Sequence, residues 1–198
     1  MNYKVNKNVI VHYEVEQGTE EWHKIRSYSC GGTGAYDVLR FGFHPNELKE
    51  SKLGGFCSAA MQRGHDLEPV ARELFAELKK DEYEVIEVGA FQNKLFPHCH
   101  ASPDGVLIKD GKIVGIIEIK CFLEKHHQEI LDNGIELKIK AQLLWNMWLS
   151  ETTIGYFIAF NPDMPDDKDK LYVERVDMSE KYKKRFTEEV KKGLKELK

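Results

Sequence analysis

The sequence contains no long apolar run, and this absence bears on where the protein acts. No stretch approaches the roughly 18 uncharged apolar residues that a membrane-spanning helix requires. Residues 1–7 also lack the apolar core of a signal peptide. We therefore expect a cytoplasmic protein, in the host cytoplasm if it is viral, with no membrane partner.

Paired cysteines are absent as well. The chain has four cysteines: Cys30, Cys57, Cys99 and Cys121. None forms a Cys-x-x-Cys pair, so the sequence indicates neither a disulfide framework nor a zinc ribbon. In the triplet His98-Cys99-His100, at most the two histidines share a face of an extended chain, which does not favour a structural metal site.

Positive charge is not in excess either. Aspartate and glutamate number 33 against 29 lysines and arginines, for a formal net charge of −4. Because phosphate contacts usually depend on lysine and arginine, any DNA-binding surface must be local. Lysines and glutamates alternate in residues 179–198, which is typical of a solvated helix face. With 198 residues, 41% of them hydrophobic, the chain is expected to form one domain over residues 1–198.

Apolar periodicity predicts an alternation of helices and strands. Helices are predicted over residues 19–26, 35–39, 58–80, 134–150 and 179–197, and strands over 84–91, 101–108, 112–121, 153–160 and 171–176. Residues 43–56 have the composition of a loop. This order indicates an α/β (α+β) fold with helices flanking a mixed central sheet.

The start and the buried face of two helices are also predicted. Thr19 is the expected cap of the first helix. The long helix should bury one apolar stripe, formed by Leu67, Ala71, Leu74 and Leu78. Pro69 is comfortable only in a first helical turn, so that helix should begin near Asp66 or bend there.

Two neighbouring apolar runs carry the charged residues that suggest chemistry. Pro103-Asp104 lies in the first run, and Glu118-Ile119-Lys120 lies inside the next, after a turn. A carboxylate pair beside a lysine on adjacent strands is what a metal-dependent phosphodiester hydrolase requires. The carboxylates hold a divalent cation and the lysine lies where an attacking water is aimed. The alternative is a partly buried salt bridge at a sheet edge.

The turn between these strands decides whether Asp104 and Glu118 share a face. A two-residue loop, Asp110-Gly111, would place them on opposite faces. A three-residue loop that starts at Lys109 places them on one face, together with Lys120. We predict the three-residue loop, with the two acids diagonal to each other at roughly 7–8 Å.

The second strand is otherwise apolar on both faces. One face is expected to pack on a helix and carries Ile113, Ile117, Ile119 and Cys121. The other face carries Val114 and Ile116 beside Glu118. A charge in such a setting is costly unless it is paired or bound to a metal.

Two residues outside the strands support a site. Glu68 lies near a predicted helix start, where the helix dipole favours an ionised carboxylate. Gln142 lies in the helix that follows the strands. Taken alone, the first is a common capping pattern and the second a solvent-exposed side chain.

Together these motifs resemble the PD-(D/E)xK nuclease superfamily, and more narrowly its lambda-exonuclease or YqaJ-type viral recombinase family. The similar segments follow in the family's order and cover most of the chain: residues 15–26, 63–72, 102–105, 118–121 and 141–148. Five motifs in register are specific. The resemblance implies a restriction-endonuclease-like core.

The resemblance also implies a role for each site residue. Asp104 and Glu118 would hold a first Mg²⁺ with the backbone carbonyl of Ile119. Glu68 would act on a second ion through water, and Mn²⁺ may replace Mg²⁺. Lys120 would orient or deprotonate the attacking water, which Gln142 would steady.

Arg26 and Thr33 match the family positions that bind the 5′-terminal phosphate. The glycines around Thr33 suit this role, because exposed N–H groups in a tight turn make an anion nest. Without the resemblance we would interpret Arg26 as part of a surface salt bridge and Thr33 as a helix cap.

The family's enzymes degrade the 5′-ended strand of linear double-stranded DNA and leave a 3′ overhang for a single-strand annealing protein. They commonly close into a homotrimeric ring. The resemblance implies the same activity and partners here. Alternatives are a PD-(D/E)xK endonuclease and a non-catalytic DNA-end-binding protein, although no acid or lysine of the motif is lost. A relative with an iron–sulfur cluster would need cysteines near the C-terminus, and none follows Cys121.

Some features depart from the family or have no role in it. Residues 41–56 differ in length and composition from the expected segment. Cys57 and His65 have no assigned function. The three tryptophans, Trp22, Trp145 and Trp148, are expected to be core aromatics.

Overall fold

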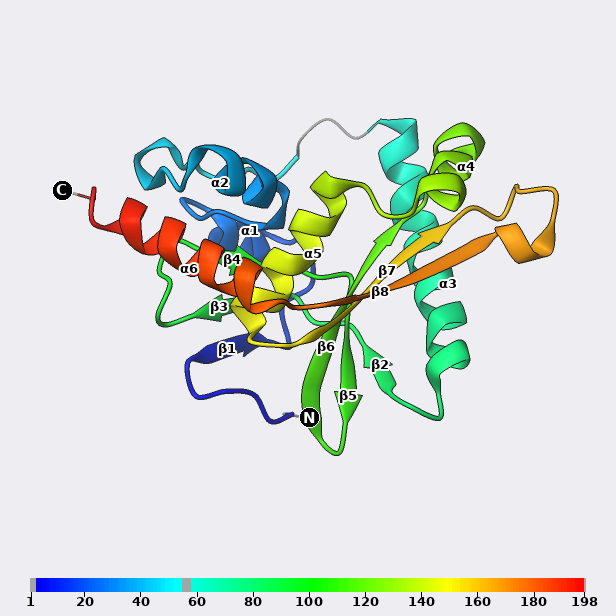
Figure 1. Cartoon of the computed structure of the whole chain (residues 1–198), viewed down its shortest axis with the longest axis horizontal. Helices are drawn as coiled ribbons and strands as arrows, with labels where there is room; N and C mark the ends of the chain where they lie inside the picture. The colour runs from blue at the N-terminus through cyan, green and yellow to red at the C-terminus, as the bar shows by residue number, and fades with distance from the viewer. Residues whose placement is uncertain (1–2, 55–57, 198) are drawn as a thin grey trace.

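A mixed five-stranded sheet forms the centre of the molecule in this computed structural model, which describes residues 3–54 and 58–197 (Figure 1). Its strands lie in the order β2 (Glu84–Ile86), β5 (Gly105–Lys109), β6 (Lys112–Lys120), β7 (Ile154–Phe160) and β8 (Leu171–Asp177). Only β6 and β7 are parallel; the other neighbours pair antiparallel. The mixed central sheet is therefore as predicted.

A second, antiparallel sheet lies beside the first. It consists of β3 (Ala90–Asn93) between β1 (Val9–His12) and β4 (His100–Ala101). The predicted strands 84–91 and 101–108 are therefore wrong as single strands, because each divides between the two sheets. At Gly89 the chain changes sheets, and a Cβ there would lie 2.0 Å from the carbonyl oxygen of Val15. Such close backbone approach is possible only for glycine.

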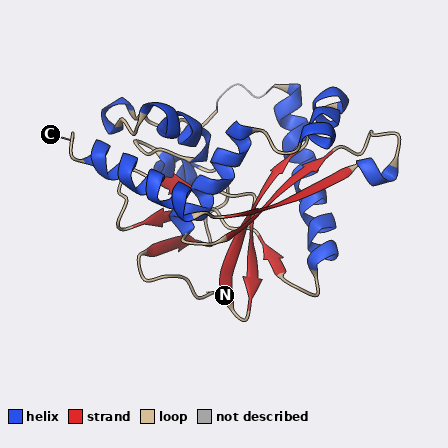
Figure 2. Cartoon of the chain, in the orientation of Figure 1, coloured by secondary structure: helices blue, strands red, loops and turns tan. Residues whose placement is uncertain are grey.

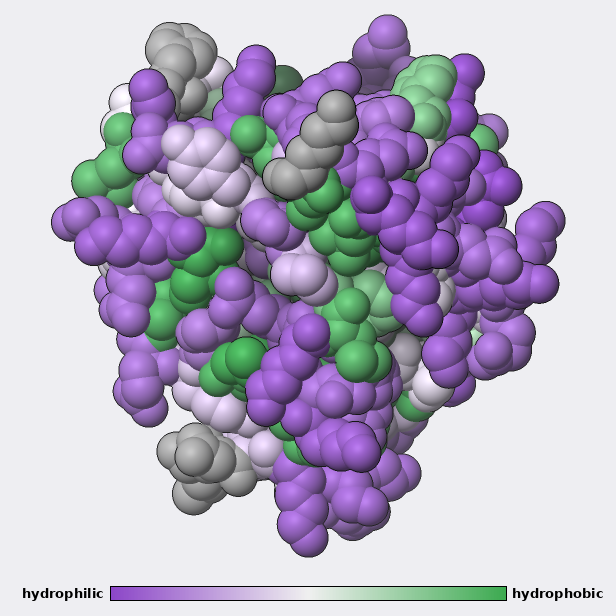
Figure 3. Space-filling model, turned by 90° about the vertical axis from the view of Figure 1, so that its left-hand side faces the viewer, coloured by the Kyte–Doolittle hydropathy of each residue, from purple (hydrophilic) through white to green (hydrophobic). Residues whose placement is uncertain are grey.

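Helices cover both faces of the central sheet (Figures 1 and 2). The helices that contact this sheet are α3 (Ala59–Lys79), α4 (Glu124–Asn133) and α5 (Leu137–Ser150). Farther from it lie α1 (Glu20–Arg26), α2 (Ala35–Phe41) and α6 (Glu180–Leu194). Figure 3 shows the side of the molecule that carries α2 and α6, where hydrophilic residues predominate. Helix α3 packs on one face, and α5 lies between the other face and the second sheet. Helix α4 was not predicted. Among the described helices, none combines the length and apolarity needed to cross a bilayer.

Helix α3 spans its predicted range but buries a different face. It starts at the cap Ser58 and continues through Pro69, so of the two predicted alternatives a start near Asp66 is wrong. Its wholly buried residues are Ala71 and Phe75, whereas Leu74 and Leu78 are 43% and 59% exposed. The sequence did not decide which residue is buried with Ala71, because Leu74 and Phe75 lie three and four positions later and either spacing is compatible with one helix face.

The first helices agree with the sequence. Thr19 caps α1 by accepting a hydrogen bond from the Trp22 N–H, at 3.4 Å. Helix α2 follows the short 3₁₀ turn Gly32–Gly34. Residues 55–57, which include Cys57 and the end of the predicted loop, lie outside the described residues.

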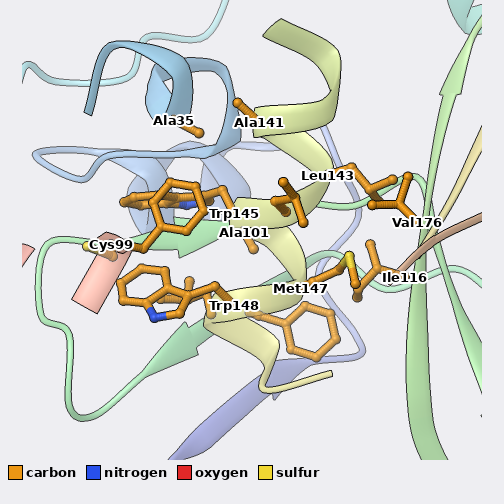
Figure 4. Packing of buried hydrophobic residues seen from close by; sticks show 14 of the residues in the cluster. Ala35, Cys99, Ala101, Ile116, Ala141, Leu143, Trp145, Met147, Trp148 and Val176 are labelled. Carbon is orange, nitrogen blue, oxygen red and sulfur yellow. The ribbon is translucent and has the colours of Figure 1, made fainter. Parts of the chain in front are cut away.

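The main core surrounds α5 (Figure 4). Leu143 and Met147 point toward the central sheet, and Trp145 and Trp148 point toward the second sheet. Both tryptophans are buried, as predicted, while Trp22 is only partly buried. Helix α5 is therefore packed firmly against β6, the strand that carries the predicted site.

The β5–β6 hairpin corrects the predicted turn. Its loop has two residues, Asp110 and Gly111, with φ of 51° and 70°, the mirror-image turn that matches strand twist. Lys109 pairs with Lys112, so the three-residue loop is wrong. A bulge further along the hairpin leaves Val114 as an extra residue between two paired positions.

The bulge has the effect on strand register that was predicted for a three-residue loop. Beyond it, Val106 pairs with Ile116 and Gly105 with Ile117, so even positions face even positions. Ile113 consequently joins Ile116 in the core around α5, and Val114 packs toward α3, the reverse of their predicted faces.

Candidate active site

Asp104 lies where β5 begins, and because Gly105 pairs with Ile117 it meets Glu118 directly across the hairpin. The predicted diagonal placement of the two acids is therefore wrong. The Asp104 N–H donates to the Ile117 carbonyl at 3.2 Å, and Asp104 Oδ2 accepts from the Ile119 N–H at 2.6 Å. These bonds fix the Asp104 carboxylate against the β6 backbone, one residue from Glu118. The predicted shared face is confirmed.

Glu118 is wholly buried, and both of its carboxylate oxygens accept hydrogen bonds. Its Oε1 accepts from Lys120 Nζ and from Gln142 Nε2, each at 2.5 Å. Its Oε2 accepts from Asn146 Nδ2 at 3.2 Å. Lys120 projects from the same face of β6, and Gln142 and Asn146 lie one turn apart on α5. A buried charge is tolerable only when it is paired and hydrogen-bonded in this way.

Glu68 reaches the same place from α3. Its Oε1 forms an ion pair with Arg72 at 2.8 Å, and Arg72 Nε donates to the Asp104 carbonyl at 2.7 Å. Glu68 and Lys120 line a groove of about 300 Å³, together with His65 one helical turn earlier. The structure therefore brings the predicted set together: Glu68, Asp104, Glu118, Lys120 and Gln142.

The proximity of these acids raises the pKa of two of them. Burial, and then the charge of Asp104, raises the pKa of Glu118 to about 8, although Lys120 opposes the rise. Burial and Asp104 also raise the pKa of Glu68 to about 7, against the effect of Arg72. For Lys120, burial lowers the pKa, but Glu118 and Asp104 outweigh it and the pKa is raised. Three mutually repelling carboxylates form a site that a cation would stabilise.

The donor set fits magnesium. Across residues 3–54 and 58–197, no three His, Cys, Asp or Glu side chains form a preassembled ligand cluster. Asp104 and Glu118 instead accept hydrogen bonds from groups within the protein. The available donors are carboxylate oxygens of Asp104, Glu118 and Glu68, with the backbone carbonyl of Ile119. Hard oxygen donors with room for water suit Mg²⁺ or Mn²⁺ rather than a softer metal.

Arg26, at the end of α1, and Thr33, in the glycine turn, come from elements other than those that carry the acids. The Arg26 guanidinium lies 4.0 Å from the Trp22 ring centroid, and burial lowers its pKa. Thr33 is exposed in the turn before α2. That turn abuts α5, since a Cβ on Gly32 would lie 2.8 Å from Cγ of Gln142. The glycine turn and the acidic site therefore share one wall.

Comparison with known families decides the family. Residues 21–153 match the YqaJ-like viral recombinase domain, more than half of the chain, and include every acid of the site. The chain belongs to this family. No curated protein matches it.

Solved structures show what the YqaJ-like fold is similar to. The alkaline exonuclease LHK-Exo from Laribacter hongkongensis matches with a TM-score of 0.74 and 25% identity, over 90% of this chain and 92% of that one. LHK-Exo in complex with dAMP matches over the same shares, with a TM-score of 0.74 and 23% identity. A phage-related exonuclease from Haemophilus somnus 129PT shares the fold, with a TM-score of 0.53 and 11% identity over 87% of this chain and 95% of that one. The predicted fold class is confirmed.

Three residues that hold the YqaJ-like site were given no role by the sequence. Asn146 binds Glu118, and Arg72 joins Glu68 to the Asp104 backbone. Gln17 Nε2 donates to the Pro103 carbonyl at 3.0 Å. The i, i+4 spacing of Glu68 and Arg72 was a usable signal for an ion pair. Asn146 is also four positions after Gln142, which places both on one face of α5.

Proposed function

We propose that this YqaJ-like protein is a Mg²⁺-dependent exonuclease that degrades the 5′-ended strand of linear double-stranded DNA, in phage-type recombination by single-strand annealing. The observation that carries the proposal is the convergence of Asp104, Glu118 and Lys120 at the end of one hairpin, with Glu68 facing them. The likeness to an alkaline exonuclease at 25% identity supports the same activity.

Two magnesium ions would be held by the acids. Asp104, Glu118 and the Ile119 carbonyl would bind the first, and Glu68 the second through water. When bound, the ions supply Lewis-acid stabilisation of the negative charge that develops during phosphodiester hydrolysis.

The side chains of the chain would position the reactants. Lys120, whose Nζ donates to Glu118 at 2.5 Å, would orient the attacking water or, once deprotonated, accept its proton. Gln142 and Asn146 hold both oxygens of Glu118 and keep that carboxylate aimed into the site.

The end of the DNA strand would be recognised beside the acids. Arg26 and Thr33 would bind the 5′ phosphate, with exposed N–H groups of the glycine turn as additional donors. The shared wall between this turn and α5 supports a coupling between end recognition and cleavage. A homotrimeric ring would collect local positive charge around threaded DNA, and a single-strand annealing protein would receive the 3′ overhang.

The test uses end-labelled linear duplexes with and without a 5′ phosphate, and a closed circle, in Mg²⁺. The proposal predicts release of mononucleotides from the 5′ end, faster with the phosphate, and an intact circle. Internal cuts in the circle would instead identify an endonuclease. Binding to ends without any cleavage would identify a DNA-end-binding protein.

A further inference from the structure

The groove at the acidic site continues into an apolar hollow. The polar part, of about 300 Å³, contains Glu68 and Lys120. An adjoining hollow of about 340 Å³ is lined by Leu123 and His126. Both parts share Met61 and Phe122, so the two form one continuous surface. We call the apolar part, formed by Met61, Phe122, Leu123 and His126, the platform.

The platform combines two partly buried rings with two exposed, flexible side chains. The rings of Phe122 and His126 stack with centroids 3.8 Å apart and an interplanar angle of 34°. Leu123 is 61% exposed and Met61 is 52% exposed. Exposed apolar side chains that gather beside a polar site mark a place where something binds.

The platform is also held firmly. Arg63 donates to the backbone carbonyls of Cys121 and Phe122, at 3.3 and 3.2 Å. Its second terminal nitrogen, Nη2, donates to Asn161 Oδ1 at 2.8 Å and to Asp163 Oδ2 at 2.9 Å. The segment that follows Lys120 is therefore tied to both α3 and the end of β7, which makes the platform preorganised.

We propose that the platform receives the unstacked nucleobase of the nucleotide whose phosphate lies at the acids. The inference rests on the proposed function. Lys120 and Phe122 are two residues apart, at most roughly 7 Å along the chain, so one nucleotide can touch both. A base that leaves a duplex end loses its stacking partners, and an aromatic surface replaces them for any base sequence.

The test compares two ligands that differ only in the base. Binding of dAMP and of 2-deoxyribose 5-phosphate is measured in Ca²⁺ for wild type and variants. Wild type should bind dAMP more tightly by roughly 5- to 150-fold, the range expected for one base on an aromatic ring. Phe122→Ala and Leu123→Ala should lose most of this ratio while binding the sugar phosphate normally. Phe122→Tyr should keep it.

Controls separate the possible failures. Leu95→Ala removes another exposed leucine, 54% exposed against 61% for Leu123, and should keep the full ratio. If Leu123→Ala, a surface change that leaves folding intact, keeps the ratio, or if wild type has none, the inference is overturned while the nuclease proposal stands. If Leu123→Ala instead lowers the molar mass in light scattering at an unchanged ratio, the platform is a subunit contact and the inference is overturned. Failure of the wild type to cleave any duplex in Mg²⁺ would overturn the proposed function itself.

Discussion

Replacing Glu118 with glutamine should stabilise the metal-free protein at alkaline pH. The side chain is wholly buried, and burial and Asp104 raise its pKa to about 8. An unfolded glutamate ionises near pH 4.3. The folded protein therefore holds this proton more tightly, and the resulting stability is full below about pH 4 and lost as pH rises to about 8.

The size of the effect follows from that pKa difference. Ionising Glu118 in the folded state costs at most about 5 kcal/mol above pH 8. This cost already includes the attraction of Lys120. Glutamine removes the cost but keeps only one of the two carboxylate oxygens that accept hydrogen bonds. We therefore expect a net gain of about 1–3 kcal/mol in the free energy of unfolding at pH 9, and a smaller gain at pH 6.

Urea unfolding in EDTA at both pH values measures this gain. Glu129→Gln, on the exposed face of α4, serves as the control and should change stability little at either pH. A Glu118→Gln protein that is less stable than wild type at pH 9 would refute the reasoning. It would mean that the ion pair with Lys120 outweighs the cost of burial.

Other perturbations test the supports of the site. Arg72→Lys loses the forked contacts of the guanidinium to Glu68 and to the Asp104 backbone. The kcat for DNA degradation should therefore fall about 10- to 100-fold, with little change in DNA-end binding. An unchanged kcat would show that Arg72 serves packing alone. Gly32→Ala forces a Cβ against Gln142 and should cost about 1–3 kcal/mol in thermal unfolding. Its matched control is Gly64→Ala, which meets open space within α3 and should stabilise by about 0.5–1 kcal/mol. Equal effects of the two glycine changes would contradict the close contact at Gly32.

The sequence predicted the acidic site better than the backbone that builds it. The shared face of Asp104 and Glu118 was correct, but the predicted cause, a longer turn, was wrong. The actual cause is the bulge at Val114, where a Cβ on Gly115 would crowd Leu107 at 2.7 Å. Such a contact between strands is not visible in local periodicity.

Long-range contacts account for the rest of what the sequence missed. Asn146 and Glu118 are 28 positions apart, and Arg63 meets Asn161 across 98 positions. A lone buried asparagine or helical arginine carries no signal of such partners. The passage of the chain from β2 to β3 was missed for the same reason, because it depends on where Gly89 meets Val15.

The most direct test of the central claim is DNA degradation by Lys120→Ala and Asp104→Ala proteins in Mg²⁺. We predict that both lose strand degradation, while Lys120→Ala binds duplex ends in Ca²⁺ nearly as well as wild type. If both proteins degrade linear DNA as fast as wild type, these acids and this amine do not form the catalytic centre.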